Sequence, residues 1–206
     1  MSKTLNNNDL LLIINDISSR LNKLEEKNIE LTKKIEDIQK NNLNKSSKII
    51  EKIENKSIPS ILYNKWIEHV FLLIPSKLEI VFENDLLNGI YQLLKDSIEN
   101  FESIPICAYN KKKLLFYYYN EEIEKWEILE NKIFDELISR ICYHFLKEFK
   151  CCWYDVNIHK INTQEEYKNL YNSYYLKILG GDNKLSTESF NNRIKTYFYN
   201  LIKEEL

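Results

Sequence analysis

An apolar heptad repeat over residues 10–38 constrains this chain more than any other feature of its sequence. Leucine and isoleucine recur there at alternating spacings of four and three, with one polar residue in the series: Leu10, Ile14, Ile17, Leu21, Leu24, Asn28, Leu31, Ile35 and Ile38. On a helix, such a repeat forms a narrow stripe that packs against another helix in a left-handed supercoil. The pattern predicts a coiled-coil oligomerisation helix over residues 1–42.

The polar residue of this repeat carries information about the partner. Asn28 occupies an a position, where an asparagine pairs with its own copy across a parallel dimer and fixes the register at a cost in stability. Isoleucine occupies both a and d positions, which favours three or four strands. We expect a parallel homodimer, with a trimer as the next choice. The alternative is a helix that folds back on the globular part of its own chain.

The pattern changes after the repeat. Asparagine and serine dominate from residue 41, and Pro59 forces Ile58 out of helical geometry. We therefore expect a linker at residues 43–60. Residues 61–206 are long enough to build one globular domain with its own core.

Helical periodicity predicts that this domain is mostly helical, of the α+β class. The expected amphipathic helices cover residues 61–73, 76–98, 131–149, 163–179 and the chain from about 186. In the helix at 163–179, Thr163 and Glu166 fit a capping box. The side chains that we expect this helix to bury are Tyr167, Leu170, Tyr174, Tyr175 and Ile178.

Two short β-prone runs lie between the helices. Residues 104–109 and 114–119 flank a basic turn, which predicts a small antiparallel β-hairpin sheet. Residues 125–128 either add a third strand or lead directly into the next helix. Gly89, within the helix at 76–98, leaves room for another backbone to approach closely.

Composition excludes several classes of protein. No apolar run approaches the roughly 18–20 residues that span a bilayer, and the N-terminus lacks the pattern of a secretory signal. We therefore expect an intracellular protein whose four cysteines are free thiols. The net charge is −2, and no segment has the basic excess of a nucleic-acid-binding groove.

The sequence contains no clear motif for catalysis or metal binding. Cysteine and histidine cluster within eighteen residues, at Cys142, His144, Cys151, Cys152 and His159. A Cys-x-His spacing on a helix points the two side chains apart, and adjacent cysteines do not match a structural zinc knuckle. No motif surrounds any Cys–His pair as in a nucleophilic enzyme. The paired carboxylates at 121–122 and 165–166 fit solvated turns or helix starts. We expect no enzyme, no metal and no cofactor.

Nucleic-acid binding has one candidate. Lys111, Lys112 and Lys113 form the basic turn, and the tyrosines of residues 117–119 follow it. Lysines contact phosphate and tyrosines stack on bases, so the turn and the tyrosines together form a candidate for weak nucleic-acid binding. The simpler interpretation is a solvated turn.

Part of the chain resembles a known viral domain. The residues that carry the resemblance are the runs 76–90 (SKLEIVFENDLLNGI), 104–109 (IPICAY), 115–117 (LFY) and 125–127 (KWE), and Gly180-Gly181 followed by a last helix. They are similar to a C-terminal α+β domain of proteins from nucleocytoplasmic large DNA viruses, for which no reaction is known. Such domains often follow a coiled coil and an N-terminal zinc finger or DNA-binding module. This chain has the coiled coil without a Cys/His finger.

The resemblance implies a viral protein of the host cytoplasm, the viral factory or the virion. Combined with the heptad repeat, it predicts a non-enzymatic, homo-oligomeric structural, scaffold or interaction protein, with another viral protein as a further partner. The alternative is a nucleic-acid-associated protein of the virion nucleoid or replication site. Its weak basic turns would act together in the oligomer.

Overall fold

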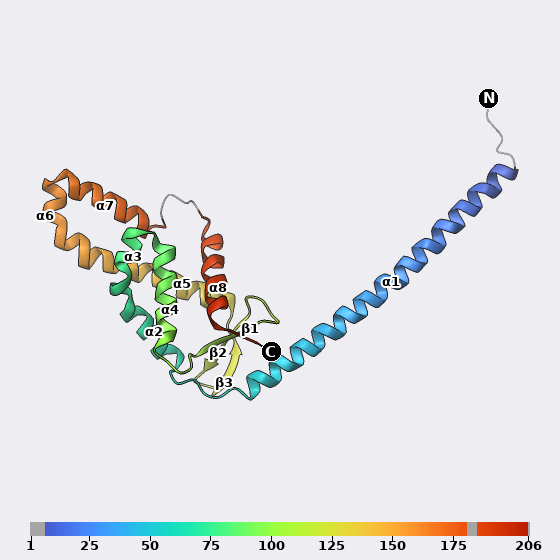
Figure 1. Cartoon of the computed structure of the whole chain (residues 1–206), viewed down its shortest axis with the longest axis horizontal. Coiled ribbons are helices and arrows are strands. Elements are labelled where there is room, and N and C mark those ends of the chain that lie inside the picture. Colours follow the sequence, from blue (N-terminus) through green and yellow to red (C-terminus); the bar gives the residue numbers. More distant parts are fainter. Residues whose placement is uncertain (1–6, 181–184, 206) are drawn as a thin grey trace, which may run out of the picture. The chain divides into compact units, whose positions relative to one another are not determined.

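The computed structural model describes residues 7–180 and 185–205, without the side chains of residues 7–14, 16 and 37–47. It is 72% helical with a small four-stranded mixed sheet, so the expected class, α+β and mostly helical, is confirmed. The chain divides into two compact units, Met1–Glu51 and Lys52–Leu206 (Figure 1).

The described part of the first unit lies in a single long helix. Helix α1 runs over Asn7–Glu54, 48 residues, and so continues through residues 43–54, where a linker is expected. Asparagine and serine there cost a few tenths of a kcal/mol each, whereas proline and glycine, the strong breakers, are absent from residues 7–54. The helix ends just before Ile58 and Pro59. The helical segment therefore extends past residue 42, and the second compact unit begins at Lys52.

The second unit contains most of the secondary structure. Its helical segments are α2 (Tyr63–Leu73), η1 (Ile74–Lys77), α3 (Leu78–Glu83), α4 (Leu86–Glu99), α5 (Asn131–Glu148), η2 (Phe149–Tyr154), α6 (Asp155–Thr163), α7 (Glu165–Ile178) and α8 (Thr187–Ile202). Segment η1 is a 3₁₀ turn that contains Pro75, and η2 is a π-helix. The helix expected to begin at Ser186 is confirmed, because the Ser186 side chain caps α8 by accepting a hydrogen bond from Ser189 N–H.

The helix predicted over residues 76–98 is divided in two. Helix α3 ends at Glu83, Asn84 leaves helical geometry, and Asp85 is the N-cap of α4. The Asp85 carboxylate accepts the backbone N–H of Asn88 at 2.8 Å. Asparagine and aspartate bond well to nearby backbone groups outside a helix, so an Asn-Asp pair interrupts an otherwise continuous apolar stripe.

A four-stranded sheet completes the unit. Its strands are β1 (Ile106–Tyr109), β2 (Phe116–Asn120), β3 (Lys125–Ile128) and β4 (Lys203–Glu204), in the order β3-β2-β1-β4. Strands β1 and β2 form the predicted antiparallel hairpin, with Cys107 opposite Tyr117, and β3 pairs antiparallel with β2. Strand β4 pairs in parallel with β1 and was not predicted, because two residues carry no periodic signal.

The core lies between these helices and the sheet. Trp66 is fully buried, its ring stacks on Phe198 at 5.9 Å, and its indole N–H donates to the Ser97 carbonyl at 3.2 Å. Gly89 on α4 is buried where an added Cβ would collide with the Val81 side chain, so the close approach involves a side chain and not another backbone.

Helices α6 and α7 form a hairpin that extends away from the sheet (Figure 1). No described side chain of α6 is buried. On α7 the expected burial of Ile178 is confirmed, whereas Tyr167, Leu170 and Tyr174 are only half-buried and Tyr175 is exposed. The predicted capping box is also absent: the Thr163 hydroxyl donates to the His159 carbonyl within α6, and α7 begins only at Glu165.

Candidate functional site

The heptad positions of α1 form the candidate site. The described apolar members, Ile17, Leu21, Leu24, Leu31 and Ile35, are 54–59% exposed, and Asn28 is exposed as well. The side chains of Leu10, Ile14 and Ile38 lie outside the described residues. Since α1 is one uninterrupted helix, the described members form a continuous apolar stripe that winds slowly around it, which we call the seam.

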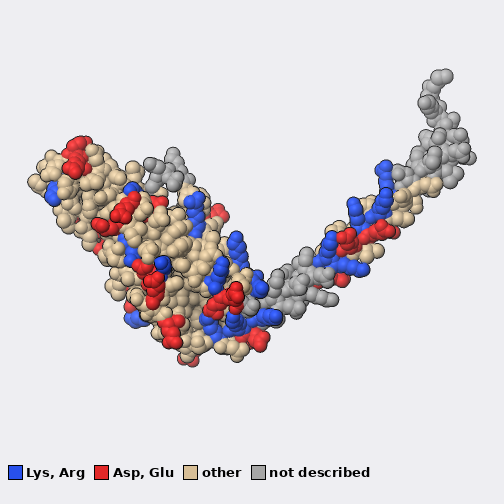
Figure 2. Space-filling view, in the orientation of Figure 1, with Lys and Arg blue, Asp and Glu red and all other residues tan. Residues whose placement is uncertain are grey.

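Polar groups beside the seam are largely satisfied within the helix. Lys34, at a g position, pairs with Glu30 at 2.5 Å, and the Thr32 hydroxyl at an e position donates to the Asn28 carbonyl at 2.8 Å. Basic and acidic side chains alternate along the described part of α1 (Figure 2). Exposed ion pairs of this kind contribute little to stability, so the apolar seam with Asn28 is the main feature of this surface.

The basic turn between β1 and β2 is the second predicted site. Lys111, Lys112 and Lys113 are exposed there, and Lys112 N–H donates to the Tyr109 carbonyl at 3.2 Å. Leu114 closes the turn with a positive φ of 59°. Basic side chains gather beside β1 and β2 in Figure 2, with acidic ones among them. The turn therefore presents three solvated cations without a continuous positive field.

The tyrosines expected to stack on bases beside this turn are not available to a ligand. Tyr117 is 6% and Tyr119 is 5% exposed, and both belong to the buried part of the sheet. Tyr118 is half-buried, with its ring 5.4 Å from that of Tyr63 and its hydroxyl 3.5 Å from Glu127. The structure therefore leaves the lysines without the aromatic platform of a nucleic-acid site.

The thiols and histidines do not assemble into a reactive group. Burial raises the pKa of Cys107 to about 12 and that of Cys142 to about 11, and the Cys152 thiol donates to Glu148, which also raises its pKa. The His144 ring stacks on Phe71 at 4.1 Å. Within residues 7–180 and 185–205, no three His, Cys, Asp or Glu side chains are placed to hold a metal ion.

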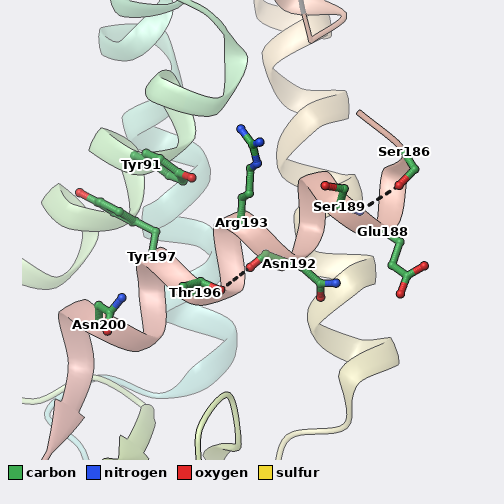
Figure 3. Close-up of a pocket in the computed structure, with 9 residues that line it drawn as sticks. All are labelled: Tyr91, Ser186, Glu188, Ser189, Asn192, Arg193, Thr196, Tyr197 and Asn200. Carbon is green, nitrogen blue, oxygen red and sulfur yellow. Dashed lines mark hydrogen bonds between the residues drawn. The ribbon is translucent and has the colours of Figure 1, made fainter. Parts of the chain in front are cut away.

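A shallow polar groove of about 660 Å³ follows one face of α8 (Figure 3). The residues that line it are Tyr91, Ser186, Glu188, Ser189, Asn192, Arg193, Thr196, Tyr197 and Asn200. The Tyr91 and Tyr197 rings stack at 4.1 Å, and the Thr196 hydroxyl donates to the Asn192 carbonyl at 2.7 Å. The groove therefore contains hydrogen-bonding groups and one arginine, but no nucleophile paired with a base.

Sequence reasoning did not identify this groove, although a signal was present. The polar residues 189, 192, 193, 196 and 200 recur at helical spacing opposite the apolar face formed by Phe190, Ile194 and Phe198. A polar face of this kind also occurs on any surface helix, so the spacing alone does not distinguish a groove from ordinary surface.

Comparison of the chain with protein-family models, curated proteins and solved structures found no match. Among the described residues, no helix combines the length and the apolar character needed to cross a bilayer.

Proposed function

We propose that this chain is a non-enzymatic, homo-oligomeric structural or interaction protein that assembles through a parallel coiled coil of α1. The observation that carries the proposal is the seam, whose five described apolar side chains remain more than half exposed along one continuous helix. Burying a leucine or isoleucine contributes about 1.5–3 kcal/mol, so a partner helix is the main stabilising contact available to the seam.

A second copy of α1 is the occupant that fits the seam best. The stripe is narrow, with two apolar positions in seven, which matches one or two partner helices and not the broad face of a globular core. Asn28 favours an identical helix in the same direction, because its amide can then pair with the amide of its own copy. A parallel dimer is the first choice, with a trimer next.

Sedimentation of the full chain at several concentrations tests the assembly. Ile35→Asp places a charge in the seam and is expected to leave a monomer at micromolar concentration. Ile29→Asp is the matched control, since Ile29 is equally exposed on the same helix, 60% against 54%, but occupies a b position. A wild-type chain that is monomeric, or equal effects of the two variants, would contradict the proposal.

The direction of the helices has its own test. In a background with Cys151→Ser and Cys152→Ser, which removes the two exposed thiols, Ile17→Cys is expected to form an intermolecular disulfide under mild oxidation. In a parallel pair, Cα atoms at one d position lie within disulfide reach. In an antiparallel pair centred on the repeat, residue 17 faces residue 31 of the other helix. The two copies of residue 17 then lie about 20 Å apart along the axis. No cross-link in an associated chain would indicate antiparallel helices.

The viral part of the proposal rests on the resemblance of residues 76–149 to a domain of large DNA viruses. It gives the host cytoplasm, the viral factory or the virion as the expected location, and another viral protein as a further partner. Mass spectrometry of purified virions and factories tests this part, and absence of the chain from both would contradict it.

Nucleic-acid association is the second candidate function, and the exposure of Lys111, Lys112 and Lys113 supports it. An oligomer would present several such turns, and together they would bind more tightly than one turn alone. Gel-shift titrations at two salt concentrations, with and without charge reversal of the three lysines to Glu, test the idea. Binding that weakens with salt and disappears on reversal is expected, and an unchanged shift would exclude this turn as the contact.

A further inference from the structure

An aromatic cavity lies between α5, η2 and α7, far in the sequence from the seam. Its volume is about 350 Å³, within the range of ligand pockets. The residues that line it are Tyr143, Leu146, Lys147, Phe149, Lys150, Tyr154, Tyr171 and Tyr175. Phe149 is buried, and the Tyr171 ring lies 5.2 Å from Tyr154 and 5.6 Å from Tyr175. Five of the eight lining residues are therefore aromatic, and two of the others are lysines.

The π-helix η2 builds one side of this cavity. Hydrogen bonds in a π-helix join residues five apart, so Phe149 and Tyr154 lie on the same side of η2. In an α-helix the same two residues would point about 140° apart. Such turns are rare and occur frequently at functional sites. The unusual turn thus contributes both a buried ring and the tyrosine opposite Tyr171 to one hollow.

The charged residues that line this cavity are both basic. Lys147 and Lys150 line the cavity, and no carboxylate does. Lys150 is 3.6 Å from Asp155 in an exposed pair, while Lys147 has no acidic partner within ion-pair distance among the described residues. Burial lowers the pKa of His144, helped by Lys147 and Arg140, whereas Glu148 acts in the opposite direction.

A second hollow of about 320 Å³ adjoins the first and shares Tyr143 and Leu146 with it. Its walls are mostly apolar and include Leu86, Ile178, Leu179 and Phe190, and none of the described residues that line it is charged. Two exposed apolar side chains, Tyr143 at 65% and Leu179 at 57%, lie along the pair of hollows. The two hollows therefore share a wall at Tyr143 and Leu146, with lysines in the lining of the first and apolar side chains in that of the second. We call the pair of hollows the groove.

We infer that this groove binds an anionic amphiphile, a single acyl chain with a carboxylate head, as a free molecule. The head lies at Lys147 and Lys150, and the chain extends past Leu146 toward Ile178 and Leu179. The two lysines of the first hollow match a carboxylate, and the apolar walls of the second hollow match a hydrocarbon tail. This site is independent of the proposed coiled coil, because none of its residues belongs to α1.

Calorimetric titration of the full chain with dodecanoate below its micelle concentration tests the site. Saturable binding of one molecule per chain is expected, with a loss of roughly tenfold in affinity for every two CH₂ groups removed in decanoate and octanoate. Dodecyltrimethylammonium, with the same tail and the opposite charge, is expected to bind at least tenfold more weakly. Equal affinity for the two amphiphiles, or binding to lipid vesicles alone, would overturn the inference.

Two pairs of variants locate the head and the tail. The double variant Lys147→Glu with Lys150→Glu is expected to bind the ammonium amphiphile better than the carboxylate, a reversal that unfolding would not produce. Lys132→Glu on the same helix is its control, since Lys132 is 83% exposed and lines neither hollow. Leu179→Asp is expected to weaken the binding of dodecanoate at least tenfold. Leu72→Asp, at a leucine 77% exposed elsewhere, is expected to leave it unchanged. Matching effects within either pair would refute the assignment.

Discussion

Helix α1 and the unit from Lys52 onward deal with apolar surface in opposite ways. The described leucines and isoleucines of the seam are more than half exposed, whereas Trp66, Val70, Ile90 and Phe198 in the second unit are completely buried. The helices of the second unit carry broad apolar faces that several neighbours cover at once. The seam has two apolar positions in seven, which suits a single neighbouring helix.

This difference predicts two kinds of stability in one chain. The core of the second unit is intramolecular, so its unfolding free energy should not depend on protein concentration. A coiled coil between chains gains stability by mass action, so its melting should shift with concentration. The predictions below separate the two, beginning with the largest expected effect.

Trp66→Ala should damage the second unit alone. The residue is fully buried, stacks on Phe198 and donates to Ser97, so its truncation should cost about 3–5 kcal/mol. Chemical denaturation followed by near-ultraviolet circular dichroism measures the loss, and sedimentation measures association. Loss of association at a temperature where the variant is still folded would show that the two units are not independent.

Gly89→Ala should destabilise the same unit by about 1–3 kcal/mol through overpacking. The new methyl group would collide with the Val81 side chain and lie 3.6 Å from the Phe145 ring. A double-mutant cycle with Val81→Ala tests this explanation. Val81→Ala removes the colliding methyl groups, so it should lower the unfolding free energy less in the Gly89→Ala background than in the wild type. Simple additivity of the two changes would contradict the packing explanation.

Asn28→Ile should act on α1 alone and in the opposite direction. It replaces a polar residue in the seam, so association should strengthen by roughly 1 kcal/mol per chain while specificity for the dimer is lost and trimers appear. Asn15→Ile, at an exposed b position, is the control and should change neither property. Sedimentation equilibrium distinguishes these outcomes, and an unchanged mass and affinity for Asn28→Ile would place Asn28 outside the interface.

The smallest expected effect is the pH dependence due to His144. Burial, with Lys147 and Arg140, lowers the pKa of this histidine below its ordinary value of 6.5. Its contribution to stability is therefore complete above pH 6.5 and declines as the pH falls through 6.5 toward the lowered pKa. His144→Phe keeps the stacking on Phe71 and should remove this part of the decline in denaturation curves between pH 7.5 and 5. An identical pH profile in the variant would show that His144 does not contribute to the decline in stability.

Particular elements show why sequence prediction succeeded in places and failed in others. Helix α8 begins after Ser186 as predicted, because capping is a local interaction over three residues. Asn84 and Asp85 end α3 through equally local chemistry, which a continuous apolar stripe concealed. Tyr171 and Tyr175 of α7 have apolar spacing but line an open cavity, since a helix in a protruding hairpin has fewer neighbours to cover its face.

The sequence by itself determined the heptad seam, the mostly helical α+β class and the β1–β2 hairpin. Each of these depends on periodicity or on contacts between residues close in the chain. Only the tertiary structure decided that β4 pairs with β1 and that Tyr117 and Tyr119 are buried. It also decided that the π-helix η2 faces α7 across an aromatic cavity. These features join residues distant in the chain, and no local pattern specifies which distant surfaces meet.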